Sequence, residues 1–182
     1  MQSLIEQLGI SHASLAARGL CEHEEAGSLE LAEVGADGKE YLLVPAAAAA
    51  WRDLKAAAQN DGIAVFLASA YRSVARQTGI IREKLEAGMA IEEIITVCAP
   101  PGFSEHHTGR AVDIVSPDVP ELGIEFEHTP AFGWLTRHAP RFGFTLSYPR
   151  GNSTGYQYEP WHWCFAEPET AGTAGLRSPP HS

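Results

Sequence analysis

The 182-residue sequence lacks a long hydrophobic run, a cysteine framework and an excess of positive charge. No apolar stretch approaches the roughly 20 residues that a membrane-spanning helix needs. The three cysteines, an odd number without a CxxC spacing, argue against a disulfide framework and against a cysteine-rich zinc site. With 13 basic and 23 acidic residues the formal net charge is -10, which disfavours binding to nucleic acid or to an anionic membrane through a general basic field.

The N-terminal segment MQSLIEQLGISHASLAARGL has no basic start and carries Glu6 early, so it does not resemble a secretory signal. We therefore expect a cytoplasmic protein, or a periplasmic or extracellular one if the chain is a trimmed piece of a longer protein. At roughly 100–200 residues per domain, the length predicts one domain with appendages. We expect a helix and hairpin extension over 1–44, a core over 45–166, and a flexible tail rich in Pro, Gly, Ser and Thr over 167–182.

Apolar spacing and turn residues predict both helices and strands. Near-helical spacing indicates a short helix within 1–18, and alternating segments on either side of GADG at 35–38 indicate a β-hairpin. Further helices are expected over 45–60, 74–87 and 90–97, and another begins at Thr129–Pro130, a cap followed by a first-turn proline. Apolar runs at 63–69 and 110–115 indicate buried strands, and 144–148 and 158–165 are also strand-like. This order predicts an α+β fold with a small mixed, largely antiparallel sheet flanked by helices.

The segment FSEHHTGRAVDIV, residues 103–115, places two histidines, a glycine and an aspartate close together. Taken singly, a loop histidine is more often a surface or hydrogen-bonded residue, and a strand aspartate a cap or an ion-pair partner. Asp113, however, is the only charged side chain in the apolar run 111–115, where an uncompensated carboxylate costs several kcal/mol. A divalent metal would compensate it, Gly109 would let the chain bend so that His106 faces the same point, and imidazole plus carboxylate suits zinc.

A catalytic zinc site needs a third protein ligand and an open position. His162, in the segment YEPWHWCF, is the best candidate because it lies between two tryptophans in a strand-like segment. The remaining histidines are weaker candidates because they lie near the chain ends, before a helix cap or on a helix: His12, His23, His128, His138 and His181.

Two further side chains have the chemistry that a metallohydrolase needs. Glu159 could take a proton from a metal-bound water and pass it to a leaving nitrogen. Residues three apart on a straight strand face opposite ways, but Pro160 predicts a bend that would bring Glu159 and His162 to one site. Arg72 follows a buried strand at the start of a loop, where a guanidinium could bind a substrate carboxylate or stabilise an oxyanion, although an arginine there is more often a surface residue.

These residues carry a resemblance to a known family. SEHHTGRAVD resembles the SxHxxGxAxD signature of the VanY-type zinc D-alanyl-D-alanine peptidases, a group that extends to lysostaphin-type enzymes and the hedgehog domain. YEPWHW resembles the second signature of the family, and SAYRSVARQ resembles its substrate-binding segment, over roughly residues 45–165 in all. The resemblance implies a hedgehog/D-Ala-D-Ala peptidase-like fold and one zinc ion per chain, with ligands at His106, Asp113 and His162.

The resemblance also implies roles for residues around the metal. Glu159 would be the catalytic base, and Arg72 would polarise the scissile carbonyl or hold the substrate. Three residues are implied as nearby substrate contacts: Tyr71, Gln77 and Ser104.

Two positions are given no chemical role by the resemblance. His107 is not a ligand in the family pattern, and we expect it at the surface. Cys164 stands where many relatives carry an arginine, and we interpret it as a small buried residue and not as a thiol that acts on the metal. Many relatives are secreted or anchored to a membrane, which this sequence does not predict.

The function expected from these observations is a zinc-dependent carboxypeptidase that hydrolyses the terminal D-alanine of a peptidoglycan-derived peptide. L,D-carboxypeptidase, dipeptidase and endopeptidase actions share the same motifs and stay open. A non-catalytic, zinc-stabilised binding module is an alternative, although Glu159 and Arg72 favour an enzyme. A third hypothesis, an unrelated α+β hydrolase that uses Cys98 or Cys164 with a histidine, lacks a recognisable nucleophile motif.

Overall fold

The computed structural model describes residues 2–167, so the tail expected to be flexible lies outside the described residues apart from Glu167. Its helices are α1 (Gln2–Gln7), α2 (His12–Ala17), α3 (Pro45–Asn60), α4 (Val74–Glu86), α5 (Ile91–Val97) and α6 (Pro130–His138). Its strands are β1 (Glu30–Val34), β2 (Glu40–Leu43), β3 (Phe66–Ser69), β4 (Ala111–Val115), β5 (Phe144–Leu146) and β6 (His162–Phe165). Single 3₁₀ turns lie at Glu105–Thr108, Ile124–His128 and Ala139–Phe142. None of the described helices is long and apolar enough to cross a membrane.

The predicted α+β class is confirmed. β3, β4, β6 and β5 form a four-stranded sheet in that order, and β1 and β2 form a separate hairpin. Every strand pair within residues 2–167 is antiparallel, so the sheet is simpler than the mixed one that the sequence allowed. A register shift between Leu67 and Ser69 on β3 marks a bulge opposite Asp113, and bulges of this kind re-aim side chains beside functional sites.

The two faces of the sheet differ because strand side chains alternate. Val112 and Ile114 on β4, with Trp163 and Phe165 on β6, are buried in the main core together with Trp51 and Leu54 of α3. Asp113 and His162, one position along each strand, therefore face the opposite side. Alternation on two neighbouring strands thus places the polar side chains of the site back to back with the hydrophobic core.

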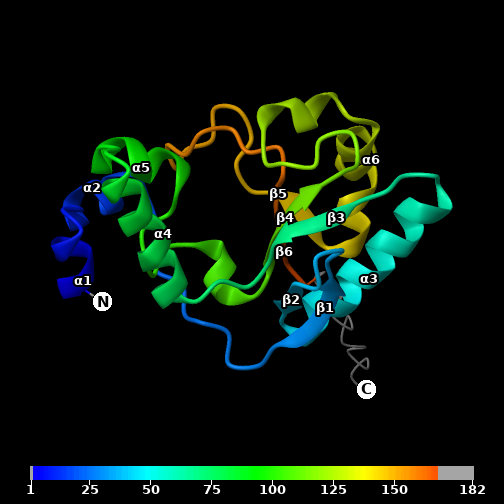
Figure 1. The fold of residues 1–182 in the computed structure, drawn as a ribbon, viewed down its shortest axis with the longest axis horizontal. Coiled ribbons are helices and arrows are strands. Elements are labelled where there is room, and N and C mark those ends of the chain that lie inside the picture. Colours follow the sequence, from blue (N-terminus) through cyan, green and yellow to red (C-terminus); the bar gives the residue numbers. More distant parts are fainter. Residues whose placement is uncertain (1, 168–182) are drawn as a thin grey trace, which may run out of the picture.

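A second, smaller core lies on the far side of the site. Figure 1 shows α1, α2, α4 and α5 gathered at one end of the molecule, with α3 and α6 at the other end beside the sheet. The N-terminal helices contribute Ile5 and Leu15 to this cluster, and they pack with Ile81 of α4 and Ile94 of α5. The helical part of the N-terminal extension therefore packs behind α4 and α5, whereas its hairpin packs with α3 in the main core. The division of the chain at residue 44 into extension and core stays a prediction.

Some expected elements are shorter than the sequence indicates. The helix expected within 1–18 is two helices, because Gly9, at φ 76°, ends the first one in a left-handed conformation. The strand expected over 63–69 pairs only over β3, an edge strand on which Phe66 is 43% exposed. The segment 158–165 joins the sheet only from His162, since a turn precedes it.

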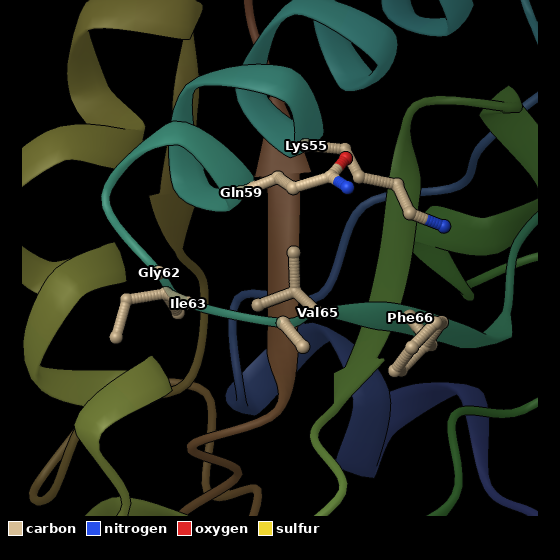
Figure 2. A pocket seen from close by; sticks show the side chains of 7 residues that line it. Lys55, Gln59, Gly62, Ile63, Val65 and Phe66 are labelled. Carbon is tan, nitrogen blue, oxygen red and sulfur yellow. The ribbon is translucent and has the colours of Figure 1, made fainter.

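One buried carboxylate stabilises the junction of hairpin, helix and sheet. Glu33 on β1 accepts hydrogen bonds from Trp51 Nε1 at 2.9 Å and from the Leu67 backbone N–H at 3.3 Å, and it pairs with Lys55 at 2.8 Å. A cavity of about 310 Å³ lies next to Lys55, between the end of α3 and β3 (Figure 2). Its walls are mainly apolar, and Lys55 is its only ionisable lining residue, so it offers no set of groups for catalysis.

Candidate metal centre

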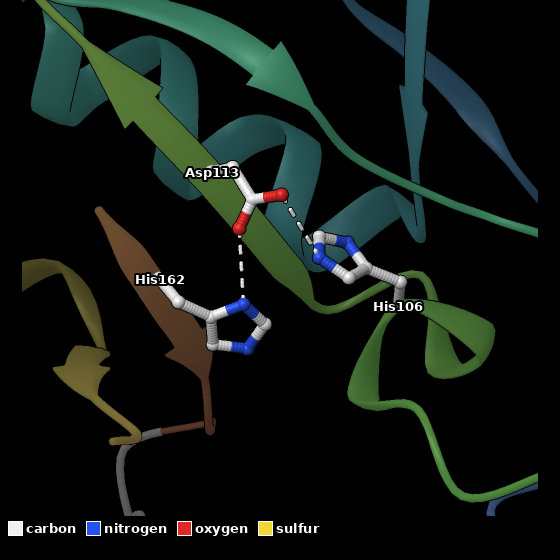
Figure 3. A group of neighbouring side chains, drawn as sticks. All are labelled: His106, Asp113 and His162. Atoms are coloured by element: carbon white, nitrogen blue, oxygen red, sulfur yellow. Dashed lines mark hydrogen bonds and ion pairs between the residues drawn. The ribbon is translucent and has the colours of Figure 1, made fainter. Parts of the chain in front are cut away.

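Three side chains from three separate segments converge at one end of the sheet. Asp113 on β4 stands directly opposite His162 on β6 in the strand register, and His106 projects from the 3₁₀ turn that precedes β4. One ligand atom from each residue lies within 4.8 Å of the others, and all three residues are buried. Figure 3 shows the two carboxylate oxygens of Asp113 directed at the two imidazole rings, one oxygen to each ring.

The turn that carries His106 depends on a glycine. Gly109 ends the turn at φ 65°, in the left-handed region that favours glycine. A Cβ atom there would lie 3.0 Å from Leu29 and 3.1 Å from Val44, because the backbone packs directly against the hairpin segment. The bend expected at this glycine is therefore present.

The hydrogen bonds of the two rings fix where their protons lie. His106 Nδ1 is 2.7 Å from the Ala70 carbonyl oxygen, which can only accept, so Nδ1 carries the proton and Nε2 presents its lone pair to Asp113 at 3.2 Å. His162 Nε2 is 2.9 Å from Glu105 Oε2, and its Nδ1 is 3.0 Å from Asp113 Oδ1. When His162 is neutral, the lone pairs of both rings face this carboxylate, and a cation between them satisfies all three groups. Metal-ligating histidines typically donate their second nitrogen to a carbonyl or a carboxylate in this way. When His162 carries a second proton, its Nδ1–H donates to Asp113 instead.

The charges of the site fit a cation as well. Against the burial that would raise it, the neighbouring imidazoles hold the pKa of Asp113 far below its ordinary value, so this residue is a carboxylate. Burial lowers the pKa of His106, although Asp113 opposes that shift. His162 responds in the opposite direction: despite its burial, the carboxylates of Asp113 and Glu105 raise its pKa to about 10. Without a metal, a proton on His162 compensates the buried carboxylates, and a divalent ion would take over that role.

Glu105 is a residue of this site that was not predicted from the sequence. Its Oε2 atom accepts hydrogen bonds from His162 Nε2 at 2.9 Å and from Ser147 Oγ at 2.6 Å. Despite partial burial, hydrogen bonds from His162 and Ser147 lower the pKa of this carboxyl group. An acidic residue directly before a candidate ligand was the available signal, but its partner lies 57 positions away in the chain.

Glu159 stands beside this cluster, as the bend at Pro160 predicts. The His162 backbone N–H donates to the Glu159 carbonyl at 3.2 Å, which closes the turn, and Glu159 Oε2 lies 3.8 Å from His162 Nδ1. Burial raises the pKa of Glu159 to about 7, an effect that His162 opposes. A carboxyl group with this pKa can both accept and release a proton near neutral pH.

Arg72 is fixed on the other side of Asp113. Its Nη1 donates to Gln77 Oε1 at 2.9 Å, its Nη2 donates to Ser69 Oγ at 3.0 Å, and Nη2 lies 3.6 Å from Asp113 Oδ2. The guanidinium is therefore held in place and only 19% exposed. A fixed cation beside a pocket is suited to hold a developing negative charge.

The three candidate ligands, Glu159 and Arg72 line a cavity of about 190 Å³, whose other walls include part of α4 and the loops at Leu122 and Tyr148. Of the three expected substrate contacts, Ser104 lines this cavity and its hydroxyl accepts from the His106 N–H at 3.4 Å. Gln77 is fully buried, and its amide binds Arg72 and the Ala99 carbonyl. Tyr71 lines a neighbouring groove, where its hydroxyl donates to Glu25 at 3.1 Å.

The expectation that His107 lies at the surface is wrong. This residue is fully buried, its Nε2 accepts from the Gly102 N–H at 3.1 Å, and its Nδ1 donates to the Arg72 carbonyl at 2.6 Å. The neutral ring therefore joins the ligand-bearing loop to the backbone of Arg72. The side chains of adjacent residues in a 3₁₀ turn point in different directions, and here both His106 and His107 point into the protein.

The two buried or half-buried thiols are not poised as nucleophiles. Burial raises the pKa of Cys98, and it raises the pKa of Cys164 to about 12. A thiol is reactive as a thiolate, so neither side chain has the low pKa of a catalytic cysteine. The cysteines are free, as the sequence predicts.

An antiparallel α+β fold that brings two histidines and an aspartate together beside a half-buried glutamate defines a domain of the metallopeptidase class. The chain belongs to the VanY D-alanyl-D-alanine carboxypeptidase family, whose model matches residues 40–168. A D-alanyl-D-alanine carboxypeptidase of Enterococcus faecalis is 35% identical over 130 residues, 66% of this chain and 47% of that protein. The chain thus spans about half the length of this curated relative.

Solved structures of similar proteins agree with this assignment. The LdcB LD-carboxypeptidase has a TM-score of 0.70 and 30% identity, over 79% of this chain and 70% of that one. A mutant of the D,D-pentapeptidase VanY from a VanB-type resistance cassette, in complex with Zn(II), has a TM-score of 0.58 and 31% identity, over 76% and 79% of the two chains. VanYB in complex with D-alanine-D-alanine has a TM-score of 0.60 and 32% identity, over 76% and 77%.

Proposed function

We propose that this protein is a zinc-dependent carboxypeptidase that hydrolyses the terminal D-alanine of peptidoglycan peptides. The observation that carries the proposal is the convergence of His106, Asp113 and His162 within 4.8 Å, next to Glu159, whose side chain is 13% exposed. Membership of the VanY family and the Zn(II) bound by a relative support zinc as the metal. The ligand set of two imidazoles and one carboxylate fits zinc and leaves a coordination position for water or substrate.

The donor atoms follow from the hydrogen bonds. His106 Nε2, His162 Nδ1 and an oxygen of Asp113 would hold the ion, because the other ring nitrogens donate to Ala70 and Glu105. A zinc ion bound there would supply a Lewis acid that acidifies water and polarises a carbonyl.

Glu159 would accept the proton of the attacking water as its oxygen adds to the scissile carbonyl carbon. Arg72, held by Gln77 and Ser69, would face the oxyanion that forms on the carbonyl oxygen. The C–N bond then breaks, and Glu159 returns the proton to the leaving amino group of D-alanine. The products are a shortened peptide and free D-alanine.

A second candidate activity is L,D-carboxypeptidase action. The similarity to the LdcB LD-carboxypeptidase, at a TM-score of 0.70 over 79% of the chain, favours it over dipeptidase and endopeptidase actions. Both candidates release a C-terminal D-alanine, and they differ in the chirality of the residue before it. A non-catalytic binding module needs no base beside the ligands, and Glu159 argues against it.

The test is to incubate the zinc-loaded protein with two peptides, one ending in D-Ala-D-Ala and one ending in an L-residue followed by D-Ala, and to identify the products by mass spectrometry. Loss of one alanine from the first peptide would support the proposal, and loss from only the second would replace it with L,D activity. If neither peptide is shortened at any zinc loading, the carboxypeptidase proposal is refuted. The cytoplasmic location expected from the sequence stays a prediction, which fractionation of the source cells tests.

A further inference from the structure

One face of α4 lines the cavity beside the candidate metal centre. The last residue of α4 that lines the cavity is a lysine, Lys84. Ile80 and Lys84 both line this cavity, and Gln77, three residues before Ile80, is buried beneath it. Spacings of three and four residues place the three side chains on one side of the helix. Lys84 is half-buried, whereas Arg82, on another side of the helix, is exposed.

Lys84 has no acidic partner within the described part of the chain: no carboxylate oxygen of residues 2–167 lies within 4.0 Å of its amino group. The other cation of the cavity, Arg72, is held by Gln77, Ser69 and Asp113. Lys84 and Cys98 both line this cavity. Burial raises the pKa of the Cys98 thiol, and the charges of Arg72 and then Lys84 oppose that shift.

A half-buried ammonium without a counter-ion, at the wall of a substrate cavity, is suited to a ligand that brings the missing negative charge. A peptide that ends in D-alanine carries a C-terminal carboxylate, and acidic residues within the peptide carry others. Arg72 is already hydrogen-bonded and, in the proposed mechanism, would face the oxyanion, so a further carboxylate needs another cation.

We infer that Lys84 is a substrate-binding residue that pairs with a carboxylate of the peptide and so determines which peptides this cavity accepts. This inference rests on the proposed function and deepens it by naming an anionic group of the substrate and its partner. The ordinary alternative is that Lys84 only stabilises the C-terminal end of α4, since cations are favourable in the last turn of a helix.

The test measures peptide binding and not turnover. The zinc-loaded Glu159→Gln protein is titrated by calorimetry with three peptides: a parent ending in D-Ala-D-Ala with one internal acidic residue, its C-terminal amide, and a form with only the internal carboxylate amidated. The same titrations are made with Lys84→Met added. Arg82→Met, which removes an exposed cation two residues away on α4, is the matched control.

We expect Lys84→Met to weaken binding of the parent peptide about tenfold, in line with a hydrogen bond to a charged group. One of the two amidations should weaken binding to the Lys84 protein by a similar factor and have no further effect on Lys84→Met. The amide with this behaviour identifies the carboxylate that Lys84 binds, whether terminal or internal. Arg82→Met should bind all three peptides as the Lys84 protein does.

If each amidation weakens peptide binding to Lys84→Met as much as it weakens binding to the Lys84 protein, the inference is refuted. A lowered melting temperature of Lys84→Met with unchanged peptide affinities would also refute it, and would assign the lysine to the helix end. If the zinc-loaded protein with Lys84 binds none of the three peptides, the proposed function itself fails, and that result is separate from a loss confined to Lys84→Met.

Discussion

Replacing Glu105 with glutamine tests how the second imidazole of the centre is held. The carboxylate accepts the His162 Nε2 proton at 2.9 Å and the Ser147 hydroxyl at 2.6 Å, and so leaves Nδ1 for a metal. Glutamine has nearly the same size but no charge, and its NH₂ group can face the ring and favour the tautomer with the proton on Nδ1. Loss of such a partner typically weakens metal binding about 10–100-fold. This corresponds to roughly 1.4–2.7 kcal/mol.

The assay is a competition between the protein and a chromogenic zinc chelator at fixed pH and ionic strength. The matched control is Glu25→Gln, whose carboxylate binds Tyr71 and the Val74 backbone N–H, away from the ligands. We expect Glu105→Gln to show the weaker zinc affinity and the control to match the unchanged protein. Equal zinc affinity in Glu105→Gln and in the unchanged protein would refute the role of Glu105 in orienting His162.

Three further predictions follow from the same geometry. Glu159→Gln should keep its zinc but lose turnover by a factor on the order of 10²–10⁴, and unchanged kcat in a zinc-loaded sample would remove Glu159 from the mechanism. Burial raises the pKa of Glu159 to about 7, and bound zinc would lower it again. Because only the ionised carboxylate accepts a proton, kcat/KM of the zinc-loaded protein should fall as the pH decreases, with a midpoint between the ordinary glutamate pKa of 4.5 and about 7. A profile that is level from about pH 8 to about pH 4 would contradict this. Gly109→Ala should destabilise the protein by about 2 kcal/mol, because residue 109 has a φ of 65° and the added Cβ atom would lie 3.0 Å from Leu29. That is a drop of roughly 4–8 °C in Tm. The control is Gly88→Ala, at φ 88° with open space around the added Cβ atom, which should lower the stability by less. Equal decreases in Tm of the two variants, measured by calorimetry, would show that packing at Gly109 has no effect.

The sequence predicted the candidate ligands because their local context is unusual. Asp113 is a carboxylate in an apolar strand, and its burial requires a compensating charge whatever the surrounding fold. His162 lies in a rigid segment between tryptophans, and strand alternation then places it on the face opposite Trp163. Arguments of this kind depend on a few neighbouring residues, so one sequence is enough to make them.

The hydrogen-bond partners of those residues could not be predicted from the sequence. Glu105 and Ser147 are hydrogen-bonded although they lie 42 positions apart in the sequence, and no local sequence pattern predicts this contact. His107 was expected at the surface because it is not a ligand in the family pattern, but its buried ring joins Gly102 to Arg72. Lys84 stands in the last turn of a helix, where a basic residue is ordinary, and only the position of α4 beside the cavity distinguishes it. These positions depend on tertiary contacts, which local sequence propensity does not predict.

The central claim is that His106, Asp113 and His162 together hold one divalent ion. Elemental analysis of the purified protein, after removal of metal by a chelator and reloading with zinc, tests it most directly, with Asp113→Asn as the comparison. We expect one zinc ion per chain in the unchanged protein and a much lower content in Asp113→Asn at the same free zinc concentration. A reloaded, folded protein without stoichiometric metal, or an Asp113→Asn variant that retains a full complement, would contradict the account.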